Sequence, residues 1–147
     1  MAKRPYKPHG FPGLFPYLTV CNAEKAINFY KEAFGFQLLT EPARDEPGSI
    51  QHAEMKFGDD VIVMFASEGA FGSTRKAPIS QGVSPSLVLY IYCKDVDALH
   101  KHAVAHGAKS TIEPNDGFWG DRFCCLIDPD GHEWMFATNI ADHKKSG

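Results

Sequence analysis

Two β-hairpin patterns, one in each half of the chain, limit its folds more than any other feature. The later pattern runs from Asp116 to Thr138, where two largely apolar stretches flank the turn DPDG at residues 128–131. Pro in the second turn position and Gly in the fourth favour a type I turn. The earlier pattern joins residues 51–57 and 61–65 through GDD at 58–60. Two similar hairpins in one short chain indicate a duplicated module.

The residues before the first hairpin predict a strand, a helix and a second strand. Residues 14–21 predict a strand, and residues 23–34 carry apolar side chains at helical spacing. Asn22 can cap this helix at its start and Gly35 can end it. Residues 36–40 predict the second strand. The first half therefore has the order βαβββ.

The second half repeats this order. Residues 87–93 predict a strand, residues 95–106 a helix and residues 108–112 another strand. The strand at 87–93 has almost no polar residue, which predicts that both of its faces are covered. Three pairs of identical residues lie at the same spacing in the two halves: Cys21 and Cys93, Ala26 and Ala98, and Gly35 and Gly107.

This repetition predicts an α+β protein built from two paired βαβββ modules. Each module has one sheet face covered by its helix, so the bare faces form curved, cup-like mixed sheets around a hollow suited to a ligand. Residues 41–49 are expected to form a polar loop. The predicted divisions are an N-terminal arm (1–13), a first module (14–67), a linker (68–86), a second module (87–138) and a C-terminal tail (139–147).

Composition limits the classes of partner and the cellular location that we expect for the chain. Its 147 residues carry a net charge of -3, which gives no electrostatic reason to expect nucleic acid or an anionic membrane as partner. No apolar run reaches the roughly 20 residues that span a bilayer, and the N-terminus lacks the apolar region of a signal peptide. The sequence therefore predicts a cytoplasmic protein.

Three segments carry a resemblance to a known family: AINFYKEAFGF, DVDALHKHAVAHGA and FWGDRFCCLIDPDGHEWMFAT. Together they resemble the vicinal oxygen chelate superfamily, which contains glyoxalase I, the bleomycin-resistance proteins and the extradiol dioxygenases. The last two segments are similar to its PhnB-like, glyoxalase-like branch in particular. The resemblance covers residues 14–138 and implies the glyoxalase/bleomycin-resistance fold in a homodimer.

The resemblance also implies where a metal ion would bind. Enzymes of the superfamily usually hold a divalent ion with four side chains, from the first and last strands of each module. These positions correspond here to Phe15, Met64, Val88 and Met135. Phe and Val have no donor atom, and Met sulfur suits soft ions rather than hard divalent ones. The expectation is therefore a protein with no metal ligands at these positions and no cofactor.

His52 and Glu54 are the candidate catalytic residues. They alternate with apolar residues on the strand at 51–57, so both face the cup if the apolar set packs on the helix. A His beside a Glu can act as a base with its orienter, or can hydrogen-bond a ligand. The alternative is a polar pair at the rim or at a dimer surface.

The candidate ligand-binding residues line the predicted cup. Tyr residues are expected to stack on a ligand, Met side chains to adapt to it, and an Arg beside a Trp to clamp a carboxylate or a flat ring. The alternatives are core packing for the Tyr and Met residues, and a salt bridge from Arg122 to Asp121 or to a partner subunit. The complete set is Phe15, Tyr17, Met64, Val88, Tyr90, Trp119, Arg122, Phe123 and Met135.

Three functions are compatible with these residues. The first is a metal-independent protein that binds an apolar or aromatic small molecule. The second is a glyoxalase-like lyase or isomerase, or a dioxygenase-related enzyme, that uses His52 and Glu54 at a relocated or metal-free site. The third is a structural protein whose cup is closed by its own side chains. The expected partners are a small-molecule ligand and a second copy of the chain.

Overall fold

A computed structural model describes residues 3–46 and 48–142. The first two residues of the predicted arm and the end of the predicted tail, residues 143–147, lie outside this described part. The first sheet has the order β1-β5-β4-β2, with β3 also paired to β4. Its strands are β1 (Tyr17–Val20), β2 (Gln37–Leu38), β3 (Ala43–Arg44), β4 (Ile50–Phe57) and β5 (Val61–Ser67).

The second sheet repeats this arrangement with the order β6-β9-β8-β7. Its strands are β6 (Val88–Tyr92), β7 (Lys109–Asp116), β8 (Asp121–Ile127) and β9 (Glu133–Asn139). In both sheets the first strand pairs in parallel with the last, while the other pairs are antiparallel. The predicted α+β class with two mixed sheets is confirmed.

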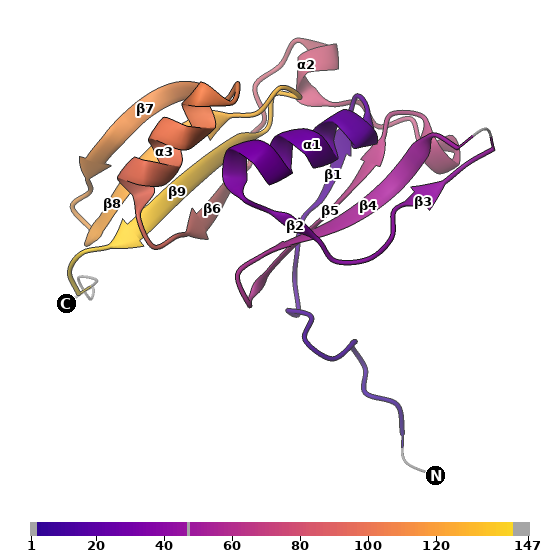
Figure 1. Cartoon of the computed structure of the whole chain (residues 1–147), viewed down its shortest axis with the longest axis horizontal. Coiled ribbons are helices and arrows are strands. Elements are labelled where there is room, and N and C mark those ends of the chain that lie inside the picture. The colour runs from indigo at the N-terminus through magenta and orange to yellow at the C-terminus, as the bar shows by residue number, and fades with distance from the viewer. Residues whose placement is uncertain (1–2, 47, 143–147) are drawn as a thin grey trace.

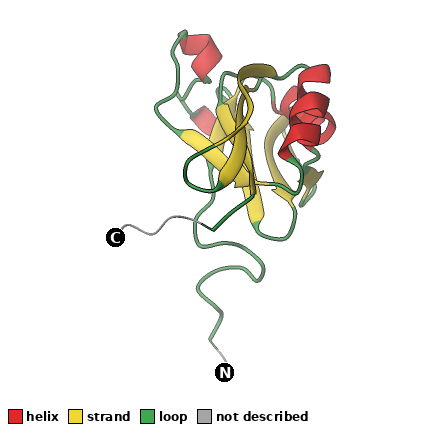
Figure 2. Ribbon diagram, turned by 90° about the vertical axis from the view of Figure 1, so that its left-hand side faces the viewer, coloured by secondary structure: helices red, strands yellow, loops and turns green. Residues whose placement is uncertain are grey.

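The helical segments are α1 (Ala23–Phe34), the 3-10 turn η1 (Ala70–Gly72), α2 (Pro78–Gln81) and α3 (Val96–Ala105). In Figure 1 the two longer helices, α1 and α3, lie side by side in front of the strands. Figure 2, turned by 90°, shows these two helices on one side of the sheets. We call the side of each sheet that faces α1 or α3 its helix face, and the other side its open face.

Helix α1 begins and ends where the local sequence predicts. The Asn22 side chain accepts a hydrogen bond from the Lys25 backbone N–H at 3.0 Å. Gly35 ends the helix in the left-handed region, at φ 76°, where a residue without a Cβ is favoured. The predicted helix at 23–34 is therefore confirmed together with both of its caps.

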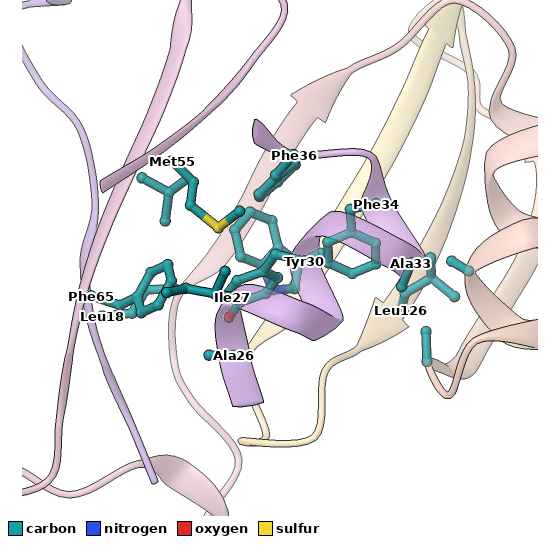
Figure 3. Packing of buried hydrophobic residues seen from close by; sticks show 14 of the residues in the cluster. Leu18, Ala26, Ile27, Tyr30, Ala33, Phe34, Phe36, Met55, Phe65 and Leu126 are labelled. Atoms are coloured by element: carbon teal, nitrogen blue, oxygen red, sulfur yellow. The ribbon is translucent and has the colours of Figure 1, made fainter. Parts of the chain in front are cut away.

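The buried face of α1 connects the two sheets into one core (Figure 3). The Tyr30 ring lies 5.4 Å from Phe65 in the first sheet and 5.6 Å from Trp134 in the second, between ring centroids. Phe34 contacts Phe136 at 4.8 Å. Aromatic side chains bury large areas and favour such edge-to-face contacts, so this cluster stabilises the two modules as a unit.

The turn at 128–131 adds polar contacts to this junction. One carboxylate oxygen of Asp128, which is buried, accepts hydrogen bonds from the Tyr30 hydroxyl at 2.6 Å and from Trp134 Nε1 at 2.9 Å. The other oxygen accepts from the backbone N–H groups of Asp130 and His132. Asp128 therefore connects α1 to the second sheet.

Two further bonds from this turn reach the first module. The Asp130 side chain accepts from the Cys21 backbone N–H at 2.8 Å, and His132 Nε2 bonds the Thr19 carbonyl oxygen at 2.8 Å. The DPDGHEW segment that carries the family resemblance thus holds the two modules together.

Several expectations about the strands differ from the structure. The first strand starts at Tyr17 rather than at residue 14, because Pro16 has no N–H to donate to a ladder. The polar loop expected at 41–49 contains the short strand β3, and the predicted linker contains α2. The prediction that both faces of the strand at 87–93 are covered is wrong, because Tyr90 and Tyr92 are exposed on the open face.

No helix in the described part of the chain combines the length and the apolar character needed to cross a membrane.

Candidate functional site

The open face of the first sheet carries polar and aromatic side chains. In β1, Leu18 and Val20 are buried on the helix face, so Tyr17 and Thr19 project from the open face. Tyr17 pairs laterally with Met64 of β5. In β4, Ala53 and Met55 are buried, which places His52 and Glu54 on the open face as well.

His52 is oriented by a tyrosine from a different strand. Its Nδ1 lies 2.8 Å from the hydroxyl oxygen of Tyr17, and the two ring centroids are 5.4 Å apart. The carboxylate of Glu54 accepts a hydrogen bond from the Thr40 hydroxyl at 3.2 Å. Tyr17, rather than Glu54, is therefore the group that positions the imidazole.

The open face of the second sheet carries a hydrogen-bonded group of aromatic residues. The fully buried Asp121 accepts hydrogen bonds at one carboxylate oxygen from the Tyr90 hydroxyl (2.6 Å), the Tyr92 hydroxyl (2.7 Å) and Trp119 Nε1 (3.1 Å). Asn139 donates to its other oxygen at 3.2 Å. Asp121 thus fixes the orientation of three aromatic side chains at once.

We call Tyr90, Tyr92, Trp119 and Phe123 the aromatic wall. The Trp119 and Phe123 rings lie 4.8 Å apart, and the Tyr90 and Tyr92 rings 5.6 Å apart. Partial burial and the hydrogen bond to Asp121 raise the pKa of Tyr90 to about 12, so its hydroxyl is protonated and donates at neutral pH. The hydroxyls of Tyr90 and Tyr92 and the indole N–H of Trp119 therefore already have a hydrogen-bond acceptor within the protein, while their rings form part of the wall.

Arg122, expected to face a ligand, lies on the helix face of the second sheet. Its guanidinium donates to both carboxylate oxygens of Asp97 in α3, at 2.7 and 2.9 Å, and to Asp116 at 2.9 Å. In β8 the side chains alternate, so Asp121 and Phe123 project to the opposite side from Arg122. These bonds raise the pKa of Arg122 and lower that of Asp97. Arg122 does not join the aromatic wall.

The positions that correspond to metal ligands do not suit a hard divalent ion. Phe15 precedes β1 and its ring packs against Phe11, while Met64 and Met135 lie opposite Tyr17 and Tyr90 in their sheets. A hard cation needs oxygen or nitrogen donors, which Phe, Val and Met side chains lack. Across residues 3–46 and 48–142, no three His, Cys, Asp or Glu side chains are grouped to hold a metal ion.

Two cavities share the edge strand β1 of the first sheet. The larger, about 540 Å³, lies between the edge strands β1 and β6 beneath the segment 74–87, and both modules line it. The smaller, about 500 Å³, lies beside β1 and β5 and shares Tyr17, Thr19 and Arg75 with the first. Of the candidate residues chosen from the sequence, Tyr17 alone lines these two cavities.

Phe71 and Arg75 are cavity residues that sequence reasoning missed. Phe71 lines the smaller cavity and Arg75 lines both. They lie in the segment expected to be a linker, where no periodic pattern distinguishes a lining residue from a solvated one. The available signal was an aromatic residue and a cation within a stretch that is otherwise rich in Gly, Ser and Pro.

Comparisons with known proteins agree with this fold. Residues 14–136 match the family model described as the Glyoxalase/Bleomycin resistance protein/Dioxygenase superfamily. The uncharacterized protein Mb0911c of Mycobacterium bovis is 34% identical over 133 residues, which cover 89% of this chain and 86% of that protein. The uncharacterized protein Rv0887c of Mycobacterium tuberculosis is also 34% identical, over 89% of this chain and 76% of its own.

Two solved structures show how closely the fold is shared. TioX from Micromonospora sp. ML1 is 25% identical, with a TM-score of 0.68 over 88% of this chain and 100% of its own. A glyoxalase/bleomycin resistance protein/dioxygenase superfamily member from Sphaerobacter thermophilus is 20% identical, with a TM-score of 0.66 over 88% of this chain and 98% of its own. The resemblance to the PhnB-like branch stays a prediction.

Proposed function

Because the chain belongs to the glyoxalase/bleomycin resistance protein/dioxygenase superfamily, we propose that it binds an apolar or aromatic small molecule on its open sheet faces, without a metal ion at the superfamily's usual positions. The aromatic wall carries this proposal. Tyr90 and Tyr92 remain 41% and 49% exposed although their hydroxyls are held by a buried carboxylate. A surface of this kind is ready to bind a flat or apolar molecule.

The energetic argument is preorganisation. Each stacked aromatic pair contributes roughly 0.5–1.5 kcal/mol beyond the area that it buries. Ordering a free side chain at a binding surface costs roughly 0.5–1.5 kcal/mol, and this cost is smaller for a ring that is already fixed. Because Asp121 holds Tyr90, Tyr92 and Trp119 before a ligand arrives, most of the stacking energy is available for affinity.

Titration with a panel of aromatic compounds tests the proposal. Trp134 is buried in the core, so Trp119 is the indole whose fluorescence should respond to a ligand on the wall. A ligand at about 100 times its Kd should add about 2.7 kcal/mol to the unfolding free energy and raise Tm. Tyr90→Ala should weaken binding, whereas Tyr6→Ala, which removes an exposed ring from the arm, should not. A panel that changes neither fluorescence nor Tm would refute the proposal.

The Tyr17–His52 bond favours an enzyme of the same superfamily as a second candidate. An imidazole held by a phenol beside a cavity can accept and return a proton, and Tyr17 lines both cavities. In this case His52→Ala should abolish turnover of a glyoxalase-type substrate while leaving aromatic ligands bound. Wild-type protein that turns over no such substrate would remove this candidate.

We also propose that the chain acts as a homodimer. Leu14 and Leu87, which lie just before β1 and β6, are 86% and 65% exposed, next to the exposed side chains of the open faces. Large exposed apolar side chains can be covered by a second copy of the chain. Light scattering should give twice the 16.3 kDa mass of the chain. A monomer at micromolar concentration would contradict the proposal.

The cytoplasmic location stays a prediction.

The closed-cup alternative has less support. Cavities of about 540 and 500 Å³ are far larger than the roughly 30 Å³ that a water molecule occupies in the liquid.

A further inference from the structure

Phe71 has a backbone conformation that its own side chain disfavours. In η1 its φ is 56° and its ψ is 28°, and it is the one residue other than Gly with positive φ in the described part of the chain. The left-handed region is unfavourable for a residue that has a Cβ atom. The ring is also 73% exposed, so it gains little from burial in return. A strained, exposed aromatic residue is a reason to look for a binding role.

The surrounding segment holds Phe71 at the smaller cavity. Ala70 is buried, and its carbonyl oxygen accepts a hydrogen bond from the Ser73 backbone N–H at 3.0 Å. Gly69 and Gly72 take up the positive φ angles on either side. The backbone of Phe71 is therefore held beside the cavity that Tyr17 and the Phe71 side chain both line.

Arg75 brings a positive charge to the same cavity. Its backbone N–H bonds the Ser73 hydroxyl at 3.2 Å, and among the described residues its guanidinium forms no ion pair. Lys76 adds a second cation to the larger cavity. Glu133 is the single carboxylate among the described residues that line the two cavities. Their charge therefore favours an anionic group.

We propose that residues 70–75 form a ligand-binding segment at the open face of the first sheet, beside the cavity that Tyr17 also lines, and that its ligand is an aromatic carboxylate. Phe71 stacks on the ring of the ligand and Arg75 pairs with its carboxylate. A guanidinium presents two parallel N–H groups that match a carboxylate, which gives such a contact both strength and direction. This inference rests on the proposed binding function and names the chemical class of the ligand.

The test compares three probes that share one aromatic area: naphthoate, naphthamide and naphthylmethylamine, substituted at the same ring position. Calorimetry on the full chain should show naphthoate binding about tenfold more tightly than naphthamide, because charge-assisted bonds are roughly twice as strong as neutral ones. Naphthylmethylamine should bind most weakly. The preference for naphthoate should shrink at high salt, because the cavities are open to solvent.

Three variants separate the parts of the proposal. Arg75→Gln should make naphthoate and naphthamide bind equally, while Lys101→Gln, which removes an exposed cation of α3, should change neither. Phe71→Gly should weaken all three probes by a similar factor without lowering Tm, because Gly tolerates the observed φ. Near-equal effects of Arg75→Gln on both probes would indicate a structural role for Arg75 and overturn the inference.

The probes also distinguish a wrong inference about the ligand class from a wrong binding function. If all three bind equally well and Arg75→Gln has no effect, the inference about the ligand is wrong and the binding function stands. If none of the three binds, the inference about the ligand fails, and the wider panel of aromatic compounds decides the binding function separately.

Discussion

The Asp128→Asn substitution should destabilise the protein by about 2–4 kcal/mol. In the wild type, one carboxylate oxygen accepts from Tyr30 and Trp134, and the other accepts from two backbone N–H groups in its own turn. An Asn side chain can keep the two backbone bonds through its single oxygen. Its NH₂ group then faces the Tyr30 hydroxyl and the Trp134 N–H. The hydroxyl can rotate and accept a hydrogen bond from the NH₂ group. The indole N–H can only donate, so it is left without an acceptor.

The magnitude follows from this difference. Leaving the buried Trp134 N–H without an acceptor costs about 1–3 kcal/mol, and the remaining bonds lose the added strength of a charged acceptor, a further contribution of roughly 1 kcal/mol. A domain of this size has an unfolding free energy of about 5–15 kcal/mol. The variant should therefore fold, with a clearly lower midpoint in urea.

Asp130→Asn is the matched control, because it changes the same turn in the same way. Burial raises the pKa of Asp130, which shows that its charged form is disfavoured where it lies. An Asn oxygen can still accept the hydrogen bond from the Cys21 backbone N–H. We expect a change of less than about 1 kcal/mol in urea unfolding followed by circular dichroism. Equal costs for the two variants, or an Asp128→Asn cost under about 1 kcal/mol, would refute the role assigned to Asp128.

Three further predictions follow from other contacts. Burial raises the pKa of Tyr30, so the contribution of Tyr30 to the unfolding free energy should be constant below about pH 10 and fall at higher pH as the unfolded chain ionises; Tyr30→Phe should reduce this fall in urea titrations. Arg122→Gln should lower stability slightly, less so at high salt, and should leave aromatic ligand affinity unchanged; weaker binding would contradict its placement on the helix face. Gly120→Ala should lower Tm, because φ is +102° and its Cβ would lie 2.7 Å from the Ala141 carbonyl oxygen, whereas Gly13→Ala, with open space, should have little effect.

Much of the fold could be predicted because its signals are local. Asn22 and Gly35 mark the ends of α1 through bonds made within a few residues. The turn at 128–131 closes with a bond from the Gly131 N–H to the Asp128 carbonyl oxygen, as its sequence indicates. Strand β3 was missed because Ala43 and Arg44 are ordinary in a polar loop, and they form a strand only through pairing with β4.

The candidate site was harder to predict because it depends on contacts between distant residues. Alternation placed His52 on the open face, but its partner Tyr17 comes from another strand. Arg122 was assigned to the wrong face because nothing in FWGDR shows where the alternation of β8 begins. Phe71 was missed because no periodic pattern marks a lining residue in the segment expected to be a linker, although it is an aromatic residue in a stretch otherwise rich in Gly, Ser and Pro. Local chemistry identified the elements, and tertiary contacts decided which side chains meet.

Asp121 and Asp128, two of the buried aspartates of the second module, make different contributions on the two faces of the sheet. Asp121 begins β8 and Asp128 follows its end, and each accepts several side-chain hydrogen bonds from aromatic residues. Asp128 bonds Tyr30 and Trp134, which are buried in the core, so its bonds stabilise the junction of the modules. Asp121 bonds rings that remain partly exposed, so its bonds leave aromatic surface in place for another molecule. The contacts that stabilise the core and the surface that we propose binds a ligand therefore lie on different faces of the second sheet.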